Sequence, residues 1–185
     1  MIGVYGLGNV LLCDDGFGPS AVRRLESQYV FPEGAVALRD LGTPGLDLAS
    51  HLLDLEELVF LDTLSLDEEP GTVHVLGKAD LLREDVKGLR QSTHEAGLRE
   101  AILTADLVGR GPAEIRFFGV VPECLESGAG LSPCVERAIE PVVALTLDAL
   151  ARKGVVPARR RAAQPTGAWW EGVGVRQRTQ VQPVP

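Results

Sequence analysis

The sequence contains no apolar run approaching the ~20 residues that a membrane-spanning helix needs. Its N-terminus also lacks the basic stretch that precedes the apolar part of a secretion signal. The three cysteines, Cys13, Cys124 and Cys134, form neither a C-x-x-C motif nor a Cys/His cluster, so no disulfide framework or structural zinc site is predicted. These absences argue against membrane insertion and secretion, and they favour a reducing, cytoplasmic location.

Basic residues are scarce over most of the chain. The 185 residues carry a formal net charge of −8, but residues 1–150 hold 25 acidic and 11 basic side chains, whereas residues 151–185 hold one acidic and seven basic side chains. Nucleic-acid binding needs clustered Lys and Arg, and the acidic part has no such stripe, so nucleic acid is not an expected partner. An acidic body is instead compatible with a cation site.

Short apolar segments alternate with segments of helical periodicity, which predicts an α/β fold. Strands are expected at 2–7, 35–39, 58–61, 72–76 and 115–121, with 72–76 antiparallel because its preceding connection is short. Helices are expected from about Pro19 to Gln28, around 46–53, after Ser92, and from Pro133 toward Lys153. This alternation implies a mostly parallel sheet of about five strands with helices on both faces. One domain over 1–153 is therefore predicted, followed by a basic tail, residues 154–185, that lacks periodicity and is typical of disorder.

The segment after the first strand begins with Gly6-x-Gly8, as dinucleotide-binding turns do. The third glycine of that fingerprint is missing, since position 11 is Leu. The loop also carries Asp14 and Asp15, whose negative charge opposes a bound phosphate. Nucleotide binding is therefore not favoured.

Two carboxylates follow strands of the predicted sheet. Asp15 follows the first strand and Asp62 closes the strand at 58–61. Ligands of open α/β sheets gather beyond the carboxyl ends of the strands, so both side chains are expected at one edge. The competing interpretation is structural: one carboxylate of Asp14-Asp15 caps the next helix while the other is solvated, and Asp62 accepts N–H groups of its own loop.

His94 is the third candidate. The sequence Ser92-Thr93-His94-Glu95 has capping-box spacing, which places His94 in the first turn of a helix, where the macrodipole favours the neutral ring that a metal ligand requires. An exposed helix-terminal histidine is the alternative. Two carboxylates and one imidazole suit Ni, Zn, Fe, Mn or Co, and hydrolysis by a metal-activated water is the natural chemistry. No G-x-S-x-G motif indicates a serine nucleophile.

Five segments, taken in order, resemble the [NiFe]-hydrogenase maturation endopeptidases. The resemblance lies in GLGNVLLCDDGFG at 6–18, DLGTPGL at 40–46, Leu61-Asp62, STHEAGL at 92–98 and GVVPE at 119–123. It implies a three-layer α/β/α fold around a largely parallel, twisted sheet. It also implies removal of a C-terminal extension from the hydrogenase large-subunit precursor after nickel insertion.

By this resemblance, Asp15, Asp62 and His94 contact nickel that is already held by the precursor, and they carry out catalysis. Asp40 and Thr43 match a loop that helps to position the substrate. The family loop usually reads Asp-Gly-Gly-Thr, so Leu41 is a departure, because Leu does not easily adopt positive φ. The tail after about residue 153 matches nothing in the family.

Two other functions remain compatible with the same residues. One is a non-catalytic, chaperone-like metal-binding module that docks on the large subunit, and the other is a metallopeptidase of broader specificity. The tail also admits a second interpretation, a docking arm, because Trp169 and Trp170 lie within it and aromatic side chains often anchor interfaces.

Overall fold

The computed structural model describes residues 1–83 and 95–165. Five strands form one sheet in the order β3-β1-β4-β6-β5. These strands are β1 (Ile2–Leu7), β3 (Val36–Gly42), β4 (Glu57–Thr63), β5 (Val73–Gly77) and β6 (Glu114–Val120). Four of them are parallel, and β5 runs antiparallel to β6, as the short connection predicted. We call the edge where the parallel strands end the carboxyl rim, and the edge where they begin the amino rim.

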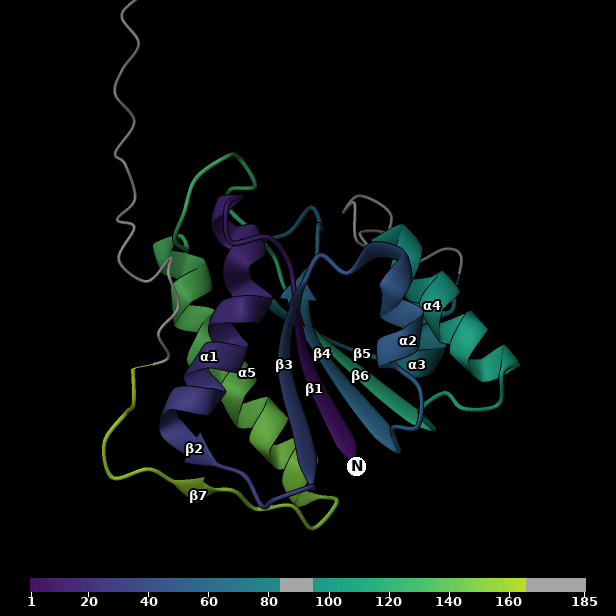
Figure 1. The fold of residues 1–185 in the computed structure, drawn as a ribbon. Coiled ribbons are helices and arrows are strands. Elements are labelled where there is room, and N and C mark those ends of the chain that lie inside the picture. The colour runs from purple at the N-terminus through teal and green to yellow at the C-terminus, as the bar shows by residue number, and fades with distance from the viewer. Residues whose placement is uncertain (84–94, 166–185) are drawn as a thin grey trace, which may run out of the picture.

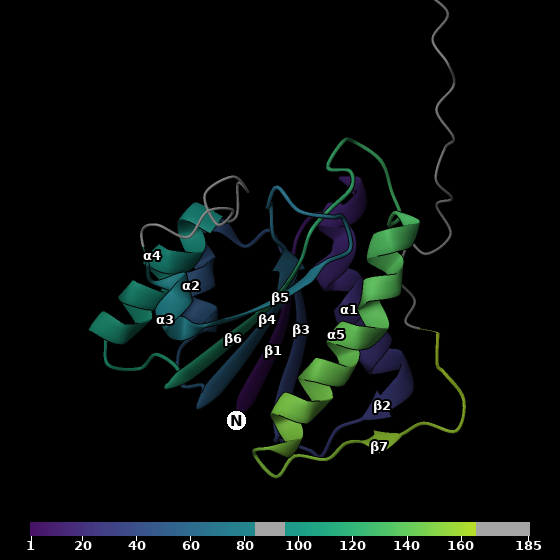
Figure 2. The same cartoon turned by 180° about the vertical axis from the view of Figure 1, so that it is seen from behind.

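Helices cover both faces of the sheet, so the predicted three-layer α/β/α architecture is confirmed. Helices α1 (Phe17–Gln28) and α5 (Pro133–Ala151) cover one face, while α2 (Leu48–His51), α3 (Lys78–Leu81) and α4 (Glu95–Leu107) cover the other (Figures 1 and 2). Within the parts of the chain that the structure describes, none of these helices is long and apolar enough to cross a membrane.

Successive side chains of a strand point to opposite faces of the sheet, and this alternation produces two hydrophobic cores. Along β1, Ile2 and Val4 pack toward α1 and α5, whereas Tyr5 and Leu7 pack toward α2 and α4. The predicted helical face of α4 is buried as well: Leu98, Ala101, Ile102 and Ala105 are each at most 5% exposed. Helix α5 begins with Pro133 at its first position, and it continues past Pro141 without being divided.

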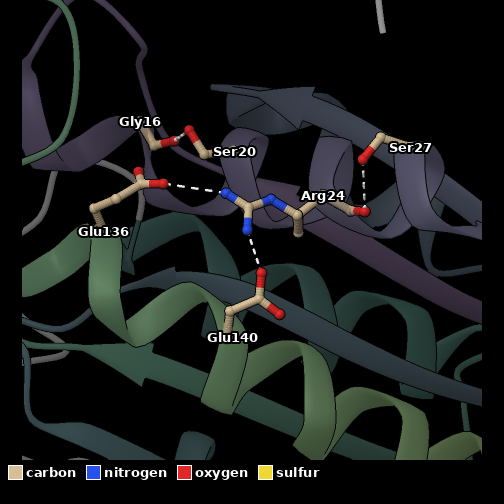
Figure 3. Close-up of polar contacts among 6 residues, drawn as sticks. All are labelled: Gly16, Ser20, Arg24, Ser27, Glu136 and Glu140. Atoms are coloured by element: carbon tan, nitrogen blue, oxygen red, sulfur yellow. Dashed lines mark hydrogen bonds and ion pairs between the residues drawn. The ribbon is translucent and has the colours of Figure 1, made fainter. Parts of the chain in front are cut away.

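Helices α1 and α5 lie side by side and are joined by charged side chains (Figure 3). The Arg24 guanidinium of α1 donates to Glu136 of α5 at 3.1 Å and also contacts Glu140. At the start of α1, which lies two residues before the predicted Pro19, the Ser20 hydroxyl donates to the Gly16 carbonyl at 2.7 Å. The Arg24 contacts lie at the surface and join the two helices, whereas the Ser20 bond lies within the first turn of α1.

Glycines let α1 approach the sheet closely. A Cβ atom on Gly6 would lie 2.4 Å from the Gly18 carbonyl oxygen, and one on Gly18 would lie 2.2 Å from the carbonyl oxygens of Leu7 and Leu61. No side chain fits at either position. The repeated glycines near the N-terminus are therefore explained by backbone packing between α1, β1 and β4.

Residues that follow α5 contact the end of α1. Strand β7 (Ala158–Arg159) pairs antiparallel with β2 (Tyr29–Val30). The backbone N–H of Arg160 donates to Gln28 O at 2.7 Å, and that of Gln164 donates to Ser27 O at 3.0 Å. A helix leaves its last carbonyls without internal partners, and residues 154–165 bind those of α1. Residues 166–185, with both tryptophans, lie outside the described residues.

Three-residue and four-residue 3₁₀ turns complete the carboxyl rim. Turn η1 (Cys13–Gly16) connects β1 to α1, and turn η2 (Gly45–Asp47) connects β3 to α2. Because β3, β1 and β4 are neighbours in the sheet, these two turns flank the end of β1. The loops that carry the predicted site residues are thus adjacent in space.

Candidate active site at the carboxyl rim

Asp15 and Asp62 come together at the carboxyl rim. Asp15 lies in η1 and Asp62 is the penultimate residue of β4, and their exposed fractions are only 5% and 2%. Gly8 lies between them with φ +125°: a Cβ atom there would be 1.9 Å from the Asp15 carbonyl oxygen and 3.6 Å from Asp62 Oδ1. The close approach of the two aspartates therefore requires glycine at position 8.

Hydrogen bonds fix the orientation of both carboxylates. The backbone N–H of Asn9 donates to Asp15 Oδ2 at 2.8 Å, and the Thr63 hydroxyl lies 3.4 Å from Asp15 Oδ1. The backbone N–H of Thr63 donates to Asp62 Oδ1 at 2.7 Å. Asp62 thus accepts the N–H bond that its structural interpretation predicts. The donor of that bond, Thr63, also contacts Asp15.

Asp14 has a different role from its neighbour. It is fully buried, and its carboxylate accepts bonds from the N–H groups of Glu123, Cys124 and Ser132 at 2.6–2.9 Å and from the Ser132 hydroxyl at 3.0 Å. Asp14 does not cap α1, whose N-cap residue is Gly16, and it does not face solvent. Asp14 therefore ties η1 to the loop 123–132 and has different partners from Asp15.

The loop carrying Asp40 and Thr43 lies next to this site. Asp40 Oδ1 accepts the Gly42 N–H at 3.0 Å, and the Arg23 guanidinium lies 3.9 Å from Asp40 Oδ2. The Gly42 carbonyl accepts the N–H of Gly8 at 2.9 Å, which joins the loop to the end of β1. Asp40 thus shapes the loop, while Thr43 is exposed beside the rim.

The backbone accommodates Leu41 at the position where the family loop usually has glycine. The register between β1 and β3 shifts after the Gly6–Asp40 pair, so that Leu7 pairs with Gly42 and Leu41 is passed over. The positive φ of +54° falls on Gly42, and Leu41 packs against the core instead. The residue that replaces the usual glycine therefore meets no conformational conflict.

His94 and the predicted cap Ser92 lie outside the described residues. Helix α4 is described from Glu95, and a Cβ atom on Gly97 would lie 3.7 Å from the Gly45 carbonyl oxygen of η2. The helix that follows His94 therefore begins at the carboxyl rim. Over residues 1–83 and 95–165, no group of three or more His, Cys, Asp or Glu side chains is arranged to hold a metal ion.

Two thiols lie beside the carboxylates. Cys13, at φ +46°, is in hydrogen-bonding contact with the Cys124 thiol, and all three cysteines are free. Burial raises the pKa of Cys13 to about 11, and the contact with Cys124 and the nearby charges of Asp14 and Glu126 add to this increase. The Cys13 thiol is therefore neutral at physiological pH and is a poor nucleophile.

Sequence reasoning missed three residues that build the site. Gly8 allows the two aspartates to approach, Thr63 contacts both of them, and Ser132 binds Asp14. Thr63 directly follows Asp62, so its position at the strand end was a signal that could have been used. Ser132 directly precedes Pro133, where a helix was predicted to begin, and that local position gives no indication of its bond to Asp14.

The arrangement presents two buried carboxylates whose oxygens are oriented by N–H and O–H donors. Carboxylate oxygens are good ligands for divalent cations. Two carboxylates here leave no room for the negative charge of a phosphate, so the site does not resemble a phosphate-binding turn.

The chain is similar to several known proteins of one family. The family model of hydrogenase maturation proteases (HycI) matches residues 19–149. The Escherichia coli K12 hydrogenase 2 maturation protease is 34% identical over 163 residues, covering 86% of this chain and 96% of that protein. The Azotobacter vinelandii hydrogenase expression/formation protein HoxM is 35% identical, covering 85% and 75% respectively. The solved structure of the hydrogenase maturating endopeptidase HybD from E. coli superimposes with a TM-score of 0.80 at 32% identity, covering 86% of this chain and 97% of that one.

The fold and the comparisons show that this protein is a hydrolase, an endopeptidase on an α/β/α scaffold. The chain belongs to the hydrogenase maturation protease family. The family-model match over residues 19–149 includes Asp40 and Asp62 and begins after Asp15.

Proposed function

We propose that this protein is a nickel-dependent endopeptidase that removes the C-terminal extension of a [NiFe]-hydrogenase large-subunit precursor after nickel has been inserted. The observation that carries the proposal is the pair of buried, oriented carboxylates of Asp15 and Asp62 at the carboxyl rim. Membership of the hydrogenase maturation protease family supports the choice of substrate. We place the reaction in the cytoplasm, because an odd number of free cysteines suits a reducing compartment.

In this proposal, Asp15, Asp62 and His94 bind the nickel that the precursor carries. Binding fixes the scissile peptide beside the rim, where a metal ion polarises a carbonyl and activates water for hydrolysis. Part of the coordination comes from the precursor itself. Cleavage therefore acts as a checkpoint, because a precursor without nickel lacks the group that holds its peptide in place.

Asp40 and Thr43 act in this scheme as substrate-positioning residues. Asp40 folds its own loop by accepting the Gly42 N–H, and the loop is attached to β1 through Gly8. The exposed Thr43 lies beside the rim, and in this proposal it contacts the peptide that approaches the carboxylates. In this proposal the loop provides a fixed surface that the substrate chain contacts.

The test is a processing assay on purified precursor, loaded with nickel or free of it, with product detected as a mobility shift on a gel. Wild-type protein is expected to process only the loaded precursor, and His94→Ala and Asp62→Asn are expected to abolish processing. Unimpaired cleavage by His94→Ala contradicts the proposal. A complex that forms without cleavage indicates a non-catalytic docking module, and cleavage of unrelated peptides indicates a broader peptidase.

A further inference from the structure

Thr63 is the one residue whose described contacts include both candidate carboxylates. It ends β4, its exposed fraction is 2%, and it pairs with Val120 of β6 across the sheet. Its backbone N–H donates to Asp62 Oδ1 at 2.7 Å, and its hydroxyl points to Asp15 Oδ1 at 3.4 Å. Two carboxylates that come from separate elements are thus joined through a single residue.

We propose that Thr63 is a positioning residue that sets the orientation of the Asp15 carboxylate relative to Asp62. This inference rests on the proposed function, because it assigns Thr63 to the same nickel-recognising site. The contact of 3.4 Å is long for an O–H···O bond. Such bonds in unliganded active sites commonly tighten when substrate binds.

The geometry makes Thr63 suited to this task. Its backbone is held in the sheet by β6, and its β-branched side chain has restricted rotation, so the hydroxyl has a defined position. The other oxygen of Asp15 is fixed by the Asn9 N–H at 2.8 Å. With both oxygens contacted, the carboxylate plane is defined, and losing the hydroxyl leaves it free to turn about the remaining bond.

Only the hydroxyl contact depends on the side chain. The N–H bond to Asp62 is a backbone bond and persists in any substitution other than proline. Thr63→Val, which has nearly the same shape, therefore removes the contact to Asp15 alone. Residues that orient metal-contacting ligands typically contribute about 10–100-fold to affinity or activity.

The experiment measures kcat/KM for cleavage of nickel-loaded precursor by wild type, Thr63→Val and Thr63→Ser. We expect Thr63→Val to lower kcat/KM by about 10-fold and Thr63→Ser to restore it to within about 3-fold of wild type. Thr146→Val is the matched control: Thr146 is equally buried, but its hydroxyl donates to Val142 O inside α5, at 2.8 Å. This control is expected to retain wild-type kcat/KM.

Urea unfolding of each variant separates a local effect from misfolding. If Thr63→Val does not fold, the pair Thr63→Ser and Thr63→Ala, which differ by one hydroxyl, provides the same comparison. Equal kcat/KM for variants with and without the hydroxyl overturns the inference, while a difference rescued by serine supports it. If wild type itself leaves loaded precursor uncut, the proposed function has failed, and this outcome is separate from any difference among the variants.

Discussion

At the amino rim of the sheet carboxylates pair with cations, whereas at the carboxyl rim Asp14 and Asp15 are held by N–H and hydroxyl groups. Glu56 contacts the N-terminal ammonium, and Lys153 contacts both Glu57 and Glu114. Across residues 1–83 and 95–165, neither Asp14 nor Asp15 has a lysine or arginine in ion-pair contact. Carboxylates are thus placed in two electrostatic settings at the two rims of the sheet.

The difference shows how a protein keeps negative charge available. An ammonium partner at the amino rim neutralises its carboxylate, and such exposed pairs add little to stability. Neutral donors at the carboxyl rim orient the carboxylates without cancelling their charge. The rim that keeps its charge is the one suited to a substrate carrying a metal cation.

The largest effect is expected for Asp15→Asn. This substitution keeps the size of the side chain but removes the charge, so processing of nickel-loaded precursor should fall by at least about 100-fold. The urea midpoint of unfolding should change little, because Asp15 accepts only two bonds. The assay is single-turnover processing together with urea denaturation, and a variant that keeps wild-type activity contradicts the role given to the charge.

Asp14→Ala, unlike Asp15→Asn, should mainly lower the free energy of unfolding. It leaves three backbone N–H groups and a hydroxyl of the loop 123–132 without their acceptor, so we expect about 3 kcal/mol of destabilisation. Activity should fall in parallel because η1 loosens. Chemical denaturation measures the free energy of unfolding, and a loss of activity at unchanged stability would place Asp14 in the chemistry instead.

Removal of residues 154–165 should have an intermediate effect. A chain ending at residue 153 loses the bonds from Arg160 and Gln164 to the last turn of α1, together with the packing of Val155 on the core. Relative to a chain ending at 165, Tm should drop by about 5 °C. Differential scanning calorimetry checks this difference, and equal Tm values would mean that the segment only lies on the surface.

The smallest effect is expected at the amino rim. Lys153→Met removes the partner of Glu57 and Glu114, but these contacts are solvent-exposed and screened by salt. Tm should change by no more than about 2 °C, and processing should match wild type. A strong loss of processing would show that the two rims are coupled, which would break the contrast between them.

Local patterns were sufficient to predict most of the fold. The apolar runs located all five strands of the sheet, and the expected parallel order brought the strand-end residues Asp15 and Asp62 to one edge. Helix α5 began where Ser132-Pro133 indicated. These features depend on periodicity and caps, which are encoded within a few residues of each other.

The rest depends on contacts between distant segments, which no local pattern encodes. The partners of Asp14 lie 109–118 residues further along the chain, so the sequence could not separate its role from that of Asp15. Residues 154–165 have no periodicity, because they are held by the end of α1 rather than by a face of their own. Thr63 acts through its position beside Asp15, which is apparent only once η1 and β4 meet.

The long-range bonds of Asp14 also set an order of events during synthesis. The chain is made from its N-terminus, so η1 leaves the ribosome while the residues that complete the Asp14 network, up to Ser132, are still to be translated. Until then the Asp14 carboxylate lacks the N–H donors that hold it, and η1 is not fixed in the position that orients Asp15. A nascent chain therefore acquires its peptidase geometry late, after more than two thirds of its residues have been added.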